Sequence, residues 1–157
     1  MAQQNITIGT ADAKAGDTLF SAFTKAESNF NELYEDNLSS TVTVNQSNAA
    51  TTLGGTIDST KVYLIDGIID MSGITVEVPS GGISIVGVSF DVSKLICNDI
   101  DYTMFTSPVG GSGNMLGKDY AIEVTGSNSR VYNLTSATGF DAFEFARINY
   151  NNCTSLG

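Results

Sequence analysis

Short strand-like runs follow one another along the chain from Val62 onward, and they constrain the fold more than any other feature. Each run holds three to six mostly apolar or β-branched residues, and Gly, Ser, Asn, Asp or Pro separates it from the next. The runs read VYLI, IIDM, ITVEV, ISIV, VSF, KLIC, TMF, YAIEV, RVYNL and FEFARI. Strands this short, with almost no helical pattern between them, are typical of a sandwich of antiparallel hairpins or of a parallel β-helix with stacked coils.

Turn chemistry favours the β-helix over the sandwich. Hairpins are usually marked by Asn-Gly or Asp-Gly turns between long alternating strands, whereas the one Asp-Gly pair, Asp66-Gly67, joins two very brief runs. The pattern I-x-I-x-G at 83–87 also recurs as I-x-V-x-G at 122–126, which lies 39 residues later. This echo predicts two coils of about twenty residues each, with alternate apolar residues pointing inward and a glycine at the corner.

One stretch near the beginning, GDTLFSAFTKAESNFNELYEDN at 16–37, has the pattern of a helix. Asp17 or Thr18 is expected to cap its first turn. Its apolar positions follow spacings of four, three, four and three, the heptad seam through which identical helices pack. The seam residues, predicted to form an oligomer interface, are Leu19, Phe23, Ala26, Phe30 and Leu33.

A helix of roughly 20 residues is marginal alone in water, so its aromatic face must be buried against something. One alternative is that it packs on its own domain. The other is a two-fold or three-fold bundle at a symmetry axis, which we favour because no amphipathic partner helix follows in the chain.

Composition divides the chain into three parts. Residues 1–37 hold a short alternating run, NITIG, and the helix, and we expect them to serve attachment and oligomerisation. Residues 38–61 are mostly small and polar, which predicts a linker or extended collar. Residues 62–157 form the mainly β part, and their end shows no element that would close a stack of strands. We therefore expect either a longer natural protein or a neighbour that covers this end.

Charge and cysteine usage exclude several classes of function. The chain has 157 residues and a net charge of −10, so a phosphate backbone is repelled and no nucleic-acid partner is expected. No run approaches the roughly 18 apolar residues of a membrane span, and the start resembles no signal peptide, so no membrane insertion is expected. Cys97 and Cys153 have no histidine to accompany them, and we expect both to be small buried hydrophobic residues.

Carboxylate pairs are the candidates for an active site, because glycan-cleaving enzymes use two carboxyl groups about 5 to 9 Å apart. The available pairs are Asp66 with Asp70, Asp99 with Asp101, and Asp119 with Glu123. In a chain this acidic, such pairs arise by chance and lie solvated on the surface. The sequence therefore predicts no catalytic residue.

Two further clusters carry little chemistry. Asn98, Asp99 and Asp101 offer oxygen ligands that suit calcium, but the twelve-residue calcium loop with glycine at its sixth place is missing. The stretch GGSGNMLG at 110–117 lacks the lysine of a phosphate loop and is expected to be a mobile surface loop. We predict no metal site and no other cofactor.

Two stretches resemble parts of known virion proteins. GDTLFSAFTKAESNFNELY at 16–34 resembles the helical N-terminal module of bacteriophage tail-fibre and tailspike proteins. VYLIDGIIDMSGITVEVPSGGISIVGVSFDVSKLI at 62–96 resembles the first coils of the right-handed parallel β-helix in tailspikes. The resemblance implies a homotrimer made in the bacterial host cytoplasm and located in the phage tail. Its N-terminus would dock to a tail or head-to-tail protein, and its β-helix would project toward a host surface glycan.

Other functions stay open at this point. The chain is alternatively the non-catalytic front of a polysaccharide-depolymerising tailspike, in which case the full-length protein is a glycan hydrolase or lyase. A secreted bacterial β-helix adhesin is a third hypothesis, which the missing signal peptide disfavours.

Overall fold

A computed structural model describes residues 18–157, apart from the side chains of Leu19 and of residues 32–39. The chain divides into two compact units, Met1–Ser40 and Thr41–Gly157, which are described separately. In the described part of the chain, no helix combines the length and the apolar character that crossing a bilayer requires.

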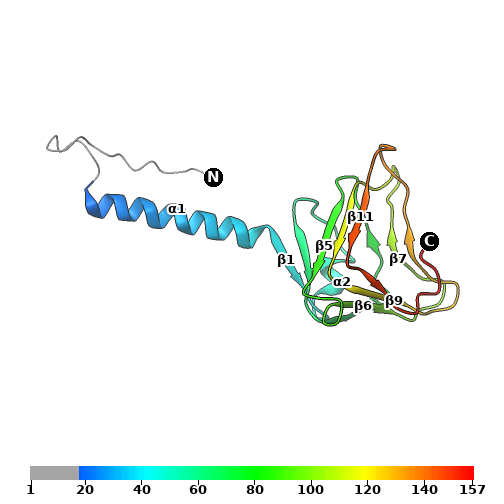
Figure 1. Ribbon diagram of the computed structural model, residues 1–157. Coiled ribbons are helices and arrows are strands. Elements are labelled where there is room, and N and C mark those ends of the chain that lie inside the picture. The colour runs from blue at the N-terminus through cyan, green and yellow to red at the C-terminus, as the bar shows by residue number, and fades with distance from the viewer. Residues whose placement is uncertain (1–17) are drawn as a thin grey trace. The chain divides into compact units, whose positions relative to one another are not determined.

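The first unit contains α1 (Leu19–Ser39), drawn in blue to cyan in Figure 1. Thr18 caps this helix, because its Oγ1 accepts a hydrogen bond of 3.2 Å from the backbone amide of Ser21. The helix was expected at 16–37, and the expected cap at Thr18 is confirmed. The expected strand at NITIG lies outside the described residues.

The second unit is mainly β, as the short runs predicted. Its elements are β1 (Thr41–Val44), α2 (Ala49–Thr52), β2 (Val62–Ile65), β3 (Ile68–Asp70), β4 (Val76–Glu77), β5 (Ile83–Gly87), β6 (Lys94–Cys97), β7 (Thr103–Thr106), β8 (Met115–Lys118), β9 (Ala121–Val124), β10 (Arg130–Asn133), β11 (Phe143–Ala146) and β12 (Asn149–Tyr150). Every strand pair in residues 41–157 is parallel, so this part of the chain is not a sandwich of antiparallel hairpins.

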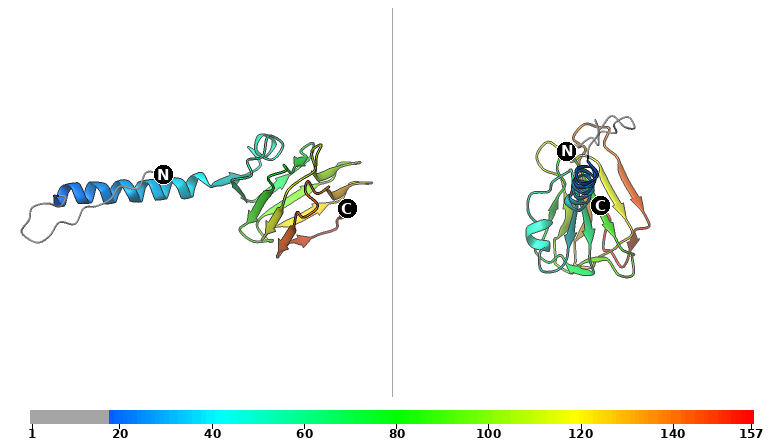
Figure 2. Two further views of the ribbon diagram at one scale, coloured as in Figure 1. Left: turned by 90° about the horizontal axis from the view of Figure 1, so that it is seen from above. Right: turned by 90° about the vertical axis from the view of Figure 1, so that its left-hand side faces the viewer.

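Three sheets share these strands. Sheet A has the order β1-β2-β5-β8-β11, sheet B the order β12-β9-β6-β3, and sheet C the order β10-β7-β4. β1 and β2 both belong to sheet A, with α2 between them; from β2 onward the chain visits A, B and C in turn, and we call one such passage a circuit. Figure 1 shows β5 and β11 of sheet A, β6 and β9 of sheet B and β7 of sheet C on three sides of one interior. In the right panel of Figure 2, the colour changes from cyan to red across the unit, because successive circuits lie side by side.

The circuits are longer and less regular than the sequence predicted. In sheet A, Val62 lies beside Ser84 but Ile83 lies beside Met115, so the first of these circuits takes 22 residues and the next takes 32. The expected echo is wrong, because 83–87 belongs to β5 of sheet A and 122–126 begins in β9 of sheet B. Corner loops of different lengths remove any fixed repeat.

The core lies between the three sheets and follows the alternation of each strand. In β5, Ile83 and Ile85 are buried while Ser84 and Val86 are only partly covered. Cys97 is buried in the same core, as expected, and Cys153 packs against it.

The segment expected as a linker contributes to this core from Thr41 onward. β1 pairs with β2, and Val44, Ala49 and Leu53 are fully buried. The boundary between the units therefore lies at residues 40 and 41, not at 61. The short helix α2 places Ala49 against the sheets, and Leu53, which directly follows α2, packs there as well.

The glycine-rich stretch at 110–117 differs from the expected surface loop. Gly111, Ser112 and Gly113 are buried, and β8 begins at Met115. A Cβ at Gly113 would lie 2.3 Å from the carbonyl oxygen of Ser80 in the preceding circuit. Glycine is therefore needed there for close stacking of two chain segments rather than for mobility.

Candidate functional site

One corner holds the two aspartates that the sequence offered as a carboxylate pair or a calcium cluster. Asp99 Oδ2 accepts a hydrogen bond of 2.8 Å from the backbone amide of Gly73, one circuit earlier. Asn128 Nδ2, one circuit later, donates to Asp101 Oδ1. Asp101 and Asn128 both adopt positive φ, at 56° and 57°, at the same place in successive circuits. These side chains join neighbouring circuits, so they do not form a paired site.

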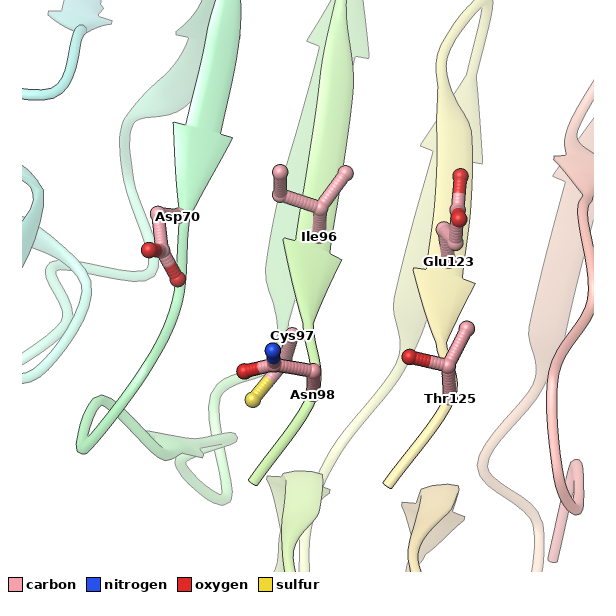
Figure 3. Close-up of a pocket in the computed structure, with 6 residues that line it drawn as sticks. All are labelled: Asp70, Ile96, Cys97, Asn98, Glu123 and Thr125. Carbon is pink, nitrogen blue, oxygen red and sulfur yellow. The ribbon is translucent and has the colours of Figure 1, made fainter.

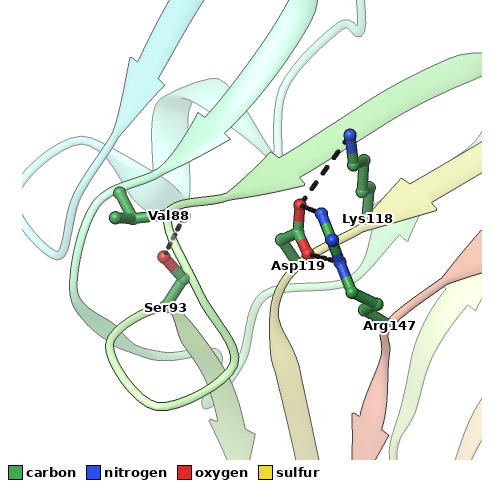
Figure 4. A network of polar contacts seen from close by, with 5 residues as sticks. All are labelled: Val88, Ser93, Lys118, Asp119 and Arg147. Carbon is green, nitrogen blue, oxygen red and sulfur yellow. Dashed lines mark hydrogen bonds and ion pairs between the residues drawn. The ribbon is translucent and has the colours of Figure 1, made fainter.

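Asp119, from another expected pair, lies at the corner between sheets A and B. Arg147 binds it in a bidentate ion pair in which Nη2 donates to Oδ2 at 2.6 Å and Nε donates to Oδ1, while Lys118 Nζ lies 4.0 Å from Oδ2 (Figure 4). The hydrogen bonds from Arg147 lower the pKa of Asp119. The carboxylate of Asp119 is thus bound by a cation from the next circuit and is not paired with Glu123, so it helps to hold neighbouring circuits together.

Sheet B brings together two carboxylates that the sequence had placed in different pairs. Asp70 pairs with Ile96, and Ile96 pairs with Glu123, so the three side chains form one row on the outer face (Figure 3). The strands that carry Asp70 and Glu123 lie two strand spacings apart, which is roughly 9.5 Å between their backbones. With Cys97, Asn98 and Thr125 they line a shallow groove of about 250 Å³. Only the strand register, which the sequence did not reveal, places Asp70 opposite Glu123.

The hydrogen bonds around Asp70 favour its charged form. Its Oδ1 accepts from the hydroxyl of Ser72 at 2.7 Å and from the amide of Ser72 at 3.0 Å, and these contacts lower the pKa of Asp70. A general acid near neutral pH needs the opposite shift. Asp70 thus presents a hydrogen-bond acceptor, and Asn98 and Thr125 add side chains that can donate to a polar ligand.

Neither the cysteines nor an acidic cluster supplies other chemistry in the described part of the chain. Burial raises the pKa of Cys97 and of Cys153, which keeps both thiols protonated at neutral pH. Among the residues that the structure describes, no three His, Cys, Asp or Glu side chains are grouped closely enough to hold a metal ion.

The helix seam has two large side chains open to solvent. Phe23 is 66% exposed and Phe30 is 71% exposed, while Ala26 is partly covered. The side chains of Leu19 and Leu33 lie outside the described residues. The expected oligomer interface stays a prediction.

A cluster of aromatic residues, which the sequence analysis missed, marks the last circuit. Phe143 and Phe145 of β11 lie beside Met115 and Gly117 of β8, on the inner side of sheet A. Both phenylalanines are partly exposed, at 42% and 38%, although Met115 is fully buried. The Tyr132 ring stacks on Phe145 at 5.4 Å between centroids. One side of this aromatic cluster packs on the core, and the opposite side is exposed.

The uncovered side forms a second cavity, of about 360 Å³. Tyr132, Phe143 and Phe145 line it together with Leu134 and Arg130. β11 and β12 are the last strands of sheets A and B, so each has one edge without a partner strand among residues 41–157. The edge of β10 is covered by the end of the chain, because the amides of Val131 and Tyr132 donate to the carbonyl oxygens of Ser155 and Leu156.

The chain matches no known protein family, no curated protein and no solved structure.

Proposed function

We propose that this chain is the N-terminal part of a phage tail fibre or tailspike. Its first unit docks to the tail, and its second unit comprises the first coils of a right-handed parallel β-helix that projects toward the host. The proposal rests on one observation: the chain passes repeatedly through three sheets of parallel strands, circuit after circuit. Parallel strands stacked in this way form rigid extended bodies that suit a projecting fibre. The resemblance of 16–34 and 62–96 to virion proteins supports the same function.

The exposed phenylalanines of α1 support assembly as a homotrimer. Phe23 and Phe30 place two aromatic rings of one heptad seam in solvent. Burial between copies removes this surface from water, at about 25 cal/mol for each Å² of apolar area. A bundle of three such helices provides both the oligomer and a symmetric base for attachment to the tail.

The aromatic end of the second unit supports a longer fibre. Phe143 and Phe145 occupy inner positions that are covered in earlier circuits. A further coil packed on this end would cover these rings and pair the edges of β11 and β12.

The second candidate function is the non-catalytic front of a glycan depolymerase. The observation in its favour is the groove on sheet B, where Asp70 and Glu123 face solvent together with Asn98 and Thr125. Incubation of the full-length protein with host capsule or lipopolysaccharide would release new reducing ends or unsaturated sugars if this function is right. Absence of any cleavage would leave the adsorption function alone.

Labelling of virions tests the main proposal directly. An antibody against the 157-residue chain is expected to label the tail in negative-stain images of the phage whose genome encodes it. Multi-angle light scattering of the purified chain should give three times 16.5 kDa. Labelling of the bacterial envelope instead of virions would contradict the proposal and favour the adhesin.

A further inference from the structure

Sheet A differs from the other two sheets in the chemistry of its outer face. Apolar side chains occupy outer positions on four successive strands of the sheet: Val62 and Leu64 on β2, Val86 on β5, Leu116 on β8 and Ala146 on β11. The register places Val62, Ser84 and Leu116 in one row and Leu64, Val86 and Lys118 in the next. Each row thus holds two apolar side chains, and Ala146 of β11 extends the second row, while Ser84 and Lys118 lie between them.

The outer face of sheet C, by contrast, is polar, as expected for a sheet face exposed to water. Its outer positions carry Glu77, Thr103, Thr106, Arg130 and Asn133, without an aliphatic residue. Sheet B is intermediate, since Ile68 and Ile96 alternate there with charged residues. Parallel sheets that read as continuous apolar runs, such as VYLI and ISIV of sheet A, are normally covered on both faces.

The outer face of sheet A also has a groove that nothing in the described part of the chain fills. The groove measures about 440 Å³ and runs along Val86, Leu116 and Ala146. Leu116 is 42% exposed beside it. A face with an apolar groove and a projecting leucine suits a protein surface better than a sugar or a nucleic acid.

The charges on this face suit a second copy of the same chain. The chain as a whole has a net charge of −10, so most surfaces of two copies repel each other. The outer face of sheet A carries one lysine and one glutamate, Lys118 and Glu144, on neighbouring strands. Two such faces can meet without excess charge of one sign.

Chain connectivity places this same sheet next to the helix seam in sequence. α1 ends at Ser39, and β1, the first strand of sheet A, begins at Thr41. Only Ser40 separates the two elements, a reach of roughly 3.5 Å for each residue. Association of copies through α1 would therefore raise the local concentration of sheet A for contacts between copies.

We propose that the outer face of sheet A packs against the same sheet of neighbouring copies of the chain. The interface centres on Val86 and Leu116, and sheets B and C face outward. This inference deepens the proposed function and rests on the trimer stated there. It adds that the second unit takes part in the assembly through one particular face.

Two matched substitutions test the interface in the complete 157-residue chain. Leu116→Glu places a carboxylate on the outer face of sheet A, and Thr106→Glu adds the same charge on the outer face of sheet C, on its middle strand β7. Sedimentation equilibrium is expected to show association at least about tenfold weaker for L116E, because an unpaired charge is costly in a packed interface. T106E should associate like the parent, and circular dichroism melts check that both variants fold.

A tryptophan reporter gives a second readout that does not depend on weakening the assembly. The chain contains no tryptophan, so Leu116→Trp and Thr106→Trp each introduce a unique fluorophore. L116W should emit at shorter wavelength and resist acrylamide quenching, whereas T106W should be readily quenched. Introducing Phe23→Asp and Phe30→Asp into L116W should shift its emission to longer wavelength as the copies separate.

The outcomes separate this inference from the proposed function. A trimeric parent in which L116E associates normally and the tryptophan of L116W is as exposed as that of T106W overturns the interface and leaves helix-based assembly standing. A parent that stays monomeric overturns the trimer and the interface together. Dissociation by L116E but not by the double helix variant supports the interface on sheet A and contradicts the helix seam.

Discussion

Ser129 Oγ joins two circuits of the second unit, because it donates a hydrogen bond of 2.7 Å to the carbonyl oxygen of Asp99 and accepts one of 3.0 Å from the amide of Tyr102. Both partners lie one circuit earlier, and Ser129 is almost completely buried. A single buried hydroxyl therefore satisfies two backbone groups at the corner between β9 and β10.

Replacement of Ser129 by alanine is expected to destabilise the second unit. The amide of Tyr102 loses its partner in a buried position, which costs about 1 to 3 kcal/mol. Urea unfolding followed by circular dichroism measures the change in the free energy of unfolding. Ser127→Ala, at an exposed position in the same corner, serves as the control and should have little effect. Equal stability of S129A and S127A would contradict this role of the hydroxyl.

Leu53→Ala tests whether residues 41–61 belong to the core. Leu53 is fully buried, and truncation of a buried leucine to alanine costs about 2 to 5 kcal/mol. Thr56→Ala is the control, because Thr56 is exposed in the same segment. If the segment were a linker, both variants would unfold at the same urea concentration as the parent.

The ion pair between Asp119 and Arg147 should make stability depend on acid. Arg147 lowers the pKa of Asp119 below its ordinary value of 3.8. The contribution is therefore present above this ordinary value and is lost as the pH falls through the lower pKa of the folded state. Arg147→Gln should lower the urea midpoint at pH 6, and the difference from the parent should shrink below about pH 4.

The size of this effect is limited by solvent, since the pair lies at the surface and salt screens it. Measurement of the same midpoints in 1 M NaCl provides the check, because a screened ion pair loses its influence at high ionic strength. A difference that persists unchanged at pH 3 would show that Arg147 acts through packing and not through charge.

The double variant Phe23→Asp and Phe30→Asp should dissociate the oligomer. Unpaired carboxylates buried in a packed seam cost several kcal/mol, about 3 to 5 for each site. Thr24→Asp with Asn31→Asp is the matched control, because these exposed positions neighbour the seam on the same helix and add the same charge. Light scattering that gives one unchanged mass for the parent and for both double variants would refute the seam.

Part of the fold could be predicted from the sequence. The mainly β character, the helix near the start, its cap at Thr18 and the burial of Cys97 follow from local patterns of apolar, β-branched and capping residues. The carboxylate row of Asp70 and Glu123 was not accessible, because these residues lie far apart in the chain and meet only through Ile96.

The core position of 41–61 and the close packing of Gly111 and Gly113 were not accessible for the same reason. Small and polar residues have the composition of a linker or loop, and composition does not report what packs above and below a segment. The carbonyl oxygen of Ser80 occupies the space that a side chain at Gly113 would need. The requirement for glycine at position 113 is therefore set by the neighbouring circuit.

The sequence by itself determined where most strands of 62–157 form and which of their residues face inward, since turn residues and period-two alternation act over a few neighbouring positions. Tertiary structure alone decided which strands pair, how many residues a circuit takes, and that Leu116 faces outward on an apolar sheet while Phe143 stays uncovered on the inner side. Parallel pairing joins residues 21 to 32 positions apart, from Thr41 beside Val62 to Ile83 beside Met115, and the corner loops between them set that distance. Corner lengths vary from circuit to circuit, so no local pattern encodes the register.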